Sequence, residues 1–204
     1  NAVAKRAFLQ HLAGLKDLPA SAPRRTILVT SGGVASGKGY ALGTIPQAKA
    51  IASTVGAIWD AAGEQNGTEN PWVLAEAEKR GLHAVFAFVN ADPAETWENP
   101  KRGVIERANK KGRMVDARLF ADSYAHGARN FDAFQTANTG KAEFIVIDNR
   151  GSPKLLDRVP NDAIRLDAER IYERATQVLE ERAGVRDAVR RGGTAGKRIW
   201  GKVG

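Results

Sequence analysis

A glycine-rich segment in the first fifth of the chain constrains the fold more than any other feature. Residues 31–40 read SGGVASGKGY, and from Gly32 to Lys38 they follow the pattern G-x-x-x-x-G-K. An apolar run at 26–30 predicts a buried strand before it, and residues 40–53 can wind into a helix after it. In this arrangement backbone N–H groups turn inward around phosphates, and the lysine reaches the outer ones. We therefore expect a phosphate-binding loop at the end of a strand.

The end of this loop departs from the commonest pattern. Gly39 stands where most such loops have Ser or Thr to bind Mg²⁺. A Gly-Lys-Gly ending resembles adenylate-kinase-type loops, in which a hydroxyl residue comes next, but here Tyr40 follows. Metal binding is then expected to be indirect or to use an acid elsewhere. The alternative is a glycine-rich turn with a solvated lysine. The residues expected to hold a nucleotide are Gly32, Gly33, Ala35, Ser36, Gly37, Lys38, Gly39 and Tyr40.

Composition narrows the possible chemistry. The 204 residues contain no cysteine and three scattered histidines, which argues against disulfides, thiolate chemistry and a histidine metal cluster. No apolar run approaches the roughly 18 residues that a membrane span needs. No signal peptide is visible, and we expect a cytoplasmic protein or one delivered into the cytoplasm of a target cell. The chain begins with Asn1, which suggests a processed product or an excised domain from which a targeting segment was lost.

The net charge of +8 is concentrated near the C-terminus. Residues 182–204 contain seven arginines and lysines against the single acid Asp187, and several glycines follow. Such a tail can hold nucleic acid or a larger assembly through its charge. It can equally be a solvated helix end. Both interpretations stay open.

The order of apolar segments predicts the fold class. We expect strands at 26–30, 54–59, 83–89 and 143–147, and helices at 2–17, 40–53, 71–80, 100–111, 116–131 and 161–190. Pro46 should bend the second helix, Asn70-Pro71 should open the third and Gly81 should end it. Alternating strands and helices predict an α/β fold. We expect a P-loop NTPase-type three-layer sandwich with a mainly parallel sheet of about four strands, helices on both faces, and helical additions at both ends. The expected units are an N-terminal helix and linker (1–25), a core (26–156), a helical segment (157–191) and a flexible tail (192–204).

Ligands of parallel sheets bind beyond the carboxyl ends of the strands. The glycine-rich loop, Asp60 and the residues after Val89 all fall at expected strand ends, hence on one rim. Asp60 is expected to hold Mg²⁺, directly or through water, or to accept a proton from a substrate hydroxyl. The alternative is a helix cap or turn aspartate. Glu64 lies four residues further on and is a candidate substrate contact or simply loop surface.

A charge-rich stretch after the third strand supplies candidate phosphate ligands. Arginines from a mobile segment commonly neutralise the charge that develops on a moving phosphoryl group. We expect one or two of this set to reach the phosphates, although any single one can be a surface ion pair. The set consists of Arg102, Arg107, Arg113, Arg118 and Arg129.

Several short stretches occur in an order that resembles the zeta toxin family of P-loop kinases. After the glycine-rich loop come AIWDAAG at 57–63, KRG at 79–81, AVFAFV at 84–89, RGVIER at 102–107, GRMV at 112–115, Tyr124, Phe131 and DNRG at 148–151. The resemblance covers about residues 26–156. It implies a toxin-type kinase that uses ATP and magnesium to phosphorylate a hydroxyl, in several members on a UDP-linked N-acetylhexosamine. It also implies an antitoxin as a partner.

Carried over by position, Lys38 binds the phosphates and Arg113 contacts the transferring group, while Arg107, Arg118 and Arg129 are weaker matches. Family members have a further strand that ends in the aspartate base. Here only about twenty residues separate Lys38 from Asp60, too few for another helix and strand. Three explanations are open. Asp60 both binds the metal and acts as the base, the base comes from a segment that was removed with the N-terminus, or the protein does not catalyse this reaction.

Two functional hypotheses follow. The first is an ATP-dependent phosphotransferase acting on a small hydroxyl compound such as a nucleotide sugar, with a polynucleotide end-kinase as a variant. The second is a nucleotide-binding module with weak or no catalysis, docked to nucleic acid or a larger assembly by its basic tail. Gly39 and the missing acid strand support the second.

Overall fold

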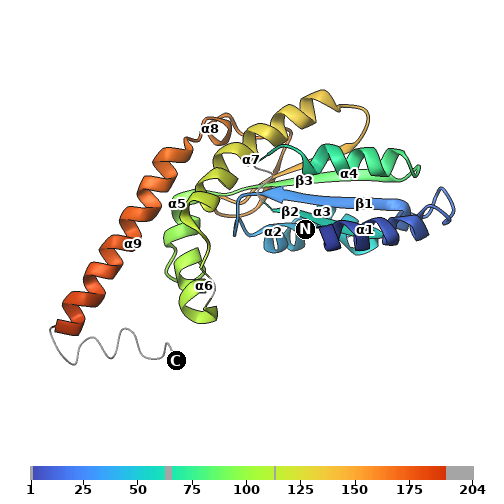
Figure 1. The fold of residues 1–204 in the computed structure, drawn as a ribbon. Helices are drawn as coiled ribbons and strands as arrows, with labels where there is room; N and C mark the ends of the chain where they lie inside the picture. Colours follow the sequence, from blue (N-terminus) through green and yellow to red (C-terminus); the bar gives the residue numbers. More distant parts are fainter. Residues whose placement is uncertain (1, 63–65, 113, 192–204) are drawn as a thin grey trace.

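The computed structural model describes residues 2–62, 66–112 and 114–191. These residues form an α/β fold around a five-stranded sheet (Figure 1). The strands are β1 (Thr26–Gly32), β2 (Ala57–Ala62), β3 (His83–Asn90), β4 (Glu143–Asp148) and β5 (Lys154–Leu156). Their order is β2-β1-β3-β4-β5; the first four are parallel, and β5 is antiparallel to β4. The expected α/β class and mainly parallel sheet are confirmed. Strand β5 was not expected, because three residues are too few to show a strand pattern.

The order in which the chain adds strands to the sheet reverses at β1. From β1 the chain passes to β2 on one side, and it then returns to β3 on the other side. At such a switch point the connections diverge at the carboxyl end of the strand and leave a crevice where ligands bind. The glycine-rich loop follows β1 directly and therefore lies at this crevice.

Helices flank the sheet. In chain order they are α1 (Ala2–Leu15), the 3₁₀ turn Pro23–Arg25, α2 (Lys38–Thr44), α3 (Pro46–Thr54), α4 (Glu69–Glu78), α5 (Pro93–Glu98), α6 (Val104–Lys111), α7 (Ala117–Ala137), α8 (Asn161–Ile164) and α9 (Ala168–Arg191). None of the helices in the described ranges is long and apolar enough to cross a membrane.

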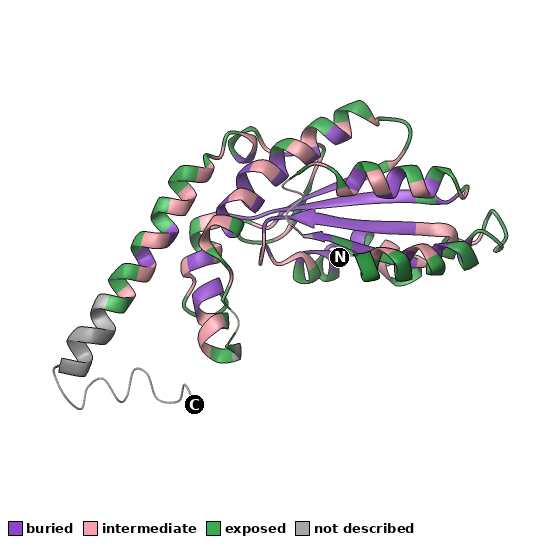
Figure 2. Cartoon of the chain, in the orientation of Figure 1, coloured by how far each residue is buried: buried purple, intermediate pink, exposed green. Residues whose placement is uncertain are grey.

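Alternate strand residues supply two cores, one on each face of the sheet. Ile27 and Val29 of β1 pack into a cluster with side chains of α1, α4 and α7, whereas Leu28 packs with α2 and α3. The strands are therefore buried on both faces (Figure 2), as expected for parallel strands covered by helices. A third cluster, which includes Trp97 and Phe120, joins α5, α6, α7 and α9 beyond the end of the sheet. Figure 1 shows α6 and α9 projecting from that end.

The boundaries near the loop differ from those expected. Pro46 separates α2 from α3, as its missing N–H and fixed backbone require. Thr54 ends α3, so β2 starts three residues later than expected, and Asp60 lies inside the strand. Helix α4 starts at Glu69, and Asn70 is buried within it and does not cap it. Gly81, with φ of 62°, ends this helix as expected, because Leu82 N–H bonds Ala77 at 3.0 Å.

Two expected helices have other bounds in the structure: one begins later than predicted, and the other is divided in two. The expected helix 100–111 begins only at Val104, and residues before it form the separate helix α5, capped by Asp92. Asn99 follows α5 and accepts hydrogen bonds from two later backbone N–H groups, which shapes the turn. The expected helix 161–190 breaks between α8 and α9, where Asp167 accepts from Glu169 N–H at 2.8 Å.

Candidate functional site

The glycine-rich loop has an unusual backbone. Gly32 and Gly37 have φ of 135° and 80°, and Ala35 between them has φ of 63°. Positive φ is rare for a residue with a side chain and costs on the order of 1–3 kcal/mol. Since Ala35 is the only non-glycine residue with positive φ in the described ranges, the surrounding contacts must hold this turn in place.

Two neighbouring elements, α7 and β3, contact the loop closely. The Val34 N–H donates to Ser123 Oγ of α7 at 3.0 Å. The Gly33 backbone lies against the Tyr124 ring, and a Cβ on Gly33 would come within 2.3 Å of it. A Cβ on Gly32 would lie 2.5 Å from the Val89 carbonyl oxygen of β3. Packing therefore requires glycine at both positions, and at Gly32 the positive φ requires it as well.

The loop keeps polar groups without partners. The backbone N–H groups of Gly37, Lys38 and Gly39 have no acceptor among the described residues. The Ser36 hydroxyl is buried and has no hydrogen-bond partner in the same part of the chain. Native proteins seldom leave buried or clustered polar groups unpaired. Successive N–H groups in a turn of this kind form a concave site for an anion.

Lys38 and Asp60 lie close together as expected, although Asp60 is inside β2 and not at the strand end where the sequence placed it. Lys38 Nζ is 3.6 Å from Asp60 Oδ1, and the same oxygen accepts a hydrogen bond from Thr30 Oγ1 at 3.0 Å. The Asp60 side chain is 59% exposed and that of Lys38 only 13%. The helix-cap or turn interpretation of Asp60 is wrong, because Asp60 pairs with Thr30 within the sheet. Thr30 carried no signal in the sequence.

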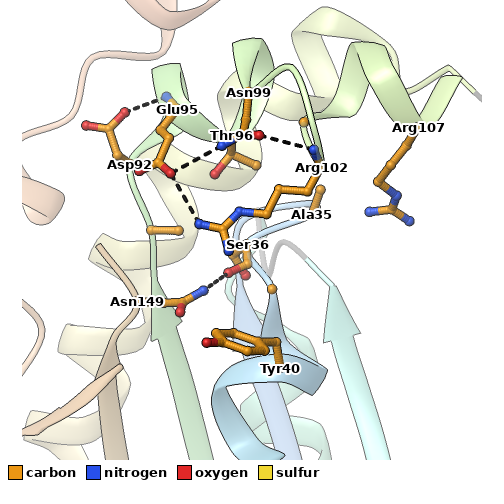
Figure 3. A pocket seen from close by; sticks show the side chains of 13 residues that line it. Ala35, Ser36, Tyr40, Asp92, Glu95, Thr96, Asn99, Arg102, Arg107 and Asn149 are labelled. Carbon is orange, nitrogen blue, oxygen red and sulfur yellow. Dashed lines mark hydrogen bonds and ion pairs between the residues drawn. The ribbon is translucent and has the colours of Figure 1, made fainter. Parts of the chain in front are cut away.

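A pocket of about 280 Å³ opens between the loop and the α5–α6 segment (Figure 3). Arg102 reaches across its mouth to Glu95 at 3.2 Å. Tyr40, at the start of α2, is exposed and faces the pocket from the loop side. The volume is at the small end of the range of about 300–1,000 Å³ for ligand pockets. Its lining consists of Ala35, Ser36, Gly37, Tyr40, Ala91, Asp92, Glu95, Thr96, Asn99, Arg102, Gly103, Arg107 and Asn149.

The candidate arginines separate into two groups. Arg107 lines the pocket, and its guanidinium makes no hydrogen bond or ion pair within the described residues. Arg118 instead forms two hydrogen bonds to Glu169, at 2.6 and 2.9 Å, and the Glu169 bond raises the pKa of the guanidinium. Arg129 donates to the Ala125 carbonyl of its own helix. The structure thus brings Arg107, but neither Arg118 nor Arg129, to the pocket.

Two predicted site residues, Arg113 and Glu64, lie outside the described residues. Their proposed roles stay predictions. Within the described ranges no group of three or more acidic or histidine side chains could hold a metal ion. Asp60 is the acid that the structure places beside Lys38.

Several residues that shape the loop were missed by sequence reasoning. Asn149 donates from Nδ2 to the Ser36 carbonyl at 2.8 Å. The preceding Asp148 is buried, which acts to raise its pKa, but hydrogen bonds from Arg150 outweigh burial and the pKa lies below its usual value. Burial raises the pKa of Tyr124, whose hydroxyl lies near Thr96 without a hydrogen bond of normal geometry. In the sequence, Tyr124 and the DNRG stretch at 148–151 contribute only to the family resemblance, and nothing there assigns them a contact with the loop.

A scan against models of known protein families found no match for this chain, and a search of curated proteins found none either.

Proposed function

We propose that the protein has a P-loop NTPase-type fold and is an ATP-dependent phosphotransferase of zeta toxin type. It would move the γ-phosphoryl group of ATP to a hydroxyl of a small molecule such as a nucleotide sugar. The observation that carries this proposal is the set of N–H groups at Gly37–Gly39, which have no partner within the described part of the chain and lie beside Lys38 at the switch point of a parallel sheet. Such a site is built for the phosphates of a nucleotide.

Lys38 is placed to exchange one anionic partner for another. Its 3.6 Å contact with Asp60 is longer than a direct hydrogen bond, and the aspartate is largely exposed. Ion pairs of this kind are weak, typically about 0–1 kcal/mol. A phosphate in the loop would therefore draw the ammonium group away from Asp60 at little cost.

The nucleoside part of the ligand would occupy the pocket beside the loop. Tyr40 offers an aromatic ring on one wall, and Arg107 offers on the other a guanidinium that has no partner among the residues the structure describes. Aromatic rings and guanidinium groups both stack on bases, and the guanidinium also pairs with phosphate oxygens. Arg113 remains the predicted contact of the transferring group.

Asp60 is the best candidate for the base. Its hydrogen bond from Thr30 fixes one carboxylate oxygen, and its exposure lets a substrate hydroxyl approach the other. Once Lys38 turns to the phosphates, the carboxylate is free to accept the hydroxyl proton.

The donor set suits a magnesium ion held mainly by phosphate oxygens and water. Gly39 supplies no side-chain oxygen, and Asp60 is the acid beside the lysine. Mg²⁺ commonly keeps several waters and uses only one or two carboxylates, so a water-mediated contact to Asp60 fits its chemistry. The ion would neutralise charge on the phosphates when bound.

A nucleotide-binding module without catalysis is the second candidate. It is favoured by the engagement of Asp60 with Lys38 and Thr30, and by the absence of a hydroxyl at Gly39. The basic segment 182–204, which would dock such a module to nucleic acid or a larger assembly, lies mostly beyond the described side chains. Binding of an antitoxin likewise stays a prediction.

Incubation of the protein with ATP and a metabolite extract tests the function. We expect a compound to gain the mass of one phosphoryl group while ATP is converted to ADP. The variant Lys38→Ala should abolish this conversion, and Lys49→Ala, which changes an exposed lysine of α3, should not. ATP binding without any phosphorylated product would support the module. Unchanged turnover in Lys38→Ala would contradict the kinase.

A further inference from the structure

The Asn149 side chain makes a contact that the proposed reaction does not itself require. Its Nδ2 donates to the Ser36 carbonyl at 2.8 Å, from the chain that follows β4 to the loop that follows β1 (Figure 3). A Cβ on Gly37 would lie 2.7 Å from the same nitrogen. The asparagine thus packs directly on the peptide that joins Ser36 to Gly37.

Geometry gives this contact a consequence for ligand binding. In a trans peptide the carbonyl of one residue and the N–H of the next point in opposite directions. When Asn149 holds the Ser36 carbonyl on one side, the Gly37 N–H must point to the other. Gly37 has positive φ and no side chain, so a flip of this peptide would meet little steric resistance. A flipped peptide would place a carbonyl oxygen where the loop otherwise offers a donor.

Asn149 is itself held in place by its neighbours. Its backbone N–H donates to the Asn90 carbonyl of β3 at 2.7 Å. Next to it, the buried Asp148 accepts from Arg150 Nε at 2.8 Å and from Asn90 Nδ2 at 3.2 Å. Arg150 also pairs with Asp162 of α8. The backbone bond of Asn149 and the bonds of its neighbour Asp148 therefore fix the position from which the Asn149 side-chain amide reaches the loop.

We propose that Asn149 is a positioning residue that locks the Ser36–Gly37 peptide with its N–H group turned into the anion site. This inference rests on the proposed function, because it assumes that the loop binds phosphates. The residue acts through the loop backbone and need not touch the ligand.

Titration calorimetry on the full chain tests the proposal, with inorganic tripolyphosphate and ATP as probes. Removal of one neutral hydrogen bond in Asn149→Ala should weaken binding of both probes by about five- to tenfold. Asn149→Asp keeps the shape but replaces the donor with an acceptor facing a carbonyl, so the loss should be larger. Asn138→Ala is the matched control, because Asn138 donates to the Phe134 carbonyl at 2.9 Å at the end of α7.

The outcomes separate the two proposals. If the wild-type protein binds neither probe, the proposed function fails. If it binds both and the Asn149 variants bind them equally well, the positioning role is overturned. A loss for ATP but not for tripolyphosphate would also overturn it, since it would mean direct contact with the nucleoside. In the wild type, the Gly37 amide resonance should shift on addition of tripolyphosphate, and Asn149→Ala should reduce that shift without lowering thermal stability more than Asn138→Ala does.

Discussion

The two walls of the pocket are built differently. The loop wall is held by neutral hydrogen bonds from Ser123 and Asn149 and by glycine backbone pressed against Tyr124. The α5–α6 wall has one ion pair across its mouth, Arg102 to Glu95, and both side chains are about half exposed or more. Closely packed side chains and backbone allow a wall only one conformation, whereas an exposed ion pair allows its side chains several. The difference predicts that the proposed anion site is formed in advance and that the opposite wall would adjust to a ligand.

The largest effect is expected where packing on the loop wall is tightest. Gly33→Ala would place a Cβ 2.3 Å from the Tyr124 ring, and either the ring or the loop must move. Overpacking of this kind costs about 1–3 kcal/mol, so the free energy of unfolding should fall and ATP binding should be lost. Urea denaturation and calorimetry measure the two effects. Gly43→Ala is the control, because open space surrounds Gly43 within α2 and the change should be neutral or stabilising.

A smaller loss is expected from the α7 side of the same wall. Ser123→Ala leaves the part-buried Val34 N–H without its acceptor; a fully buried donor would lose about 1–3 kcal/mol, and this one should lose less. We expect reduced stability in urea and a weaker affinity for ATP, because the loop loses one of its supports. Equal ATP affinity in this variant would show that the α7 contact does not organise the anion site.

Substitutions in the α5–α6 wall should weaken ATP binding without lowering the stability of the fold. Arg107→Ala should weaken ATP binding, by about 1–2 kcal/mol if the guanidinium meets a phosphate, and leave the urea midpoint unchanged. Arg129→Ala is the matched control, since this arginine bonds its own helix outside the pocket. Equal binding in the two variants would remove Arg107 from the site.

The smallest expected effect is a loss of folding stability at acid pH. The pKa of Asp148 is lowered in the folded protein by its bonds to Arg150. A lowered pKa contributes stability above the unfolded value of about 3.9 and loses it as the pH falls through the folded value. The urea midpoint should therefore decrease below about pH 4, and Asp148→Asn should flatten that decrease. An unchanged slope in the variant would contradict the role of this carboxylate.

Sequence reasoning recovered the parts of the site that depend on local pattern. The glycine-rich loop, its strand and its helix are contiguous, so periodicity and glycine spacing were sufficient. The closeness of Lys38 and Asp60 agrees with the expectation of one shared rim, although Asp60 lies inside β2 and not at its end. Asn149 and Ser123 could not be predicted in the same way. They reach the loop from residues about 90 to 110 positions away, and their side chains have no special pattern locally.

Binding of ATP to the full chain, measured by calorimetry with and without Mg²⁺, tests the central claim most directly. We predict saturable binding of one ATP per chain that Lys38→Ala weakens by at least about tenfold and Lys49→Ala leaves unchanged. Absence of binding to the wild-type protein, or equal affinity in the two variants, would contradict the claim that this loop is a phosphate site.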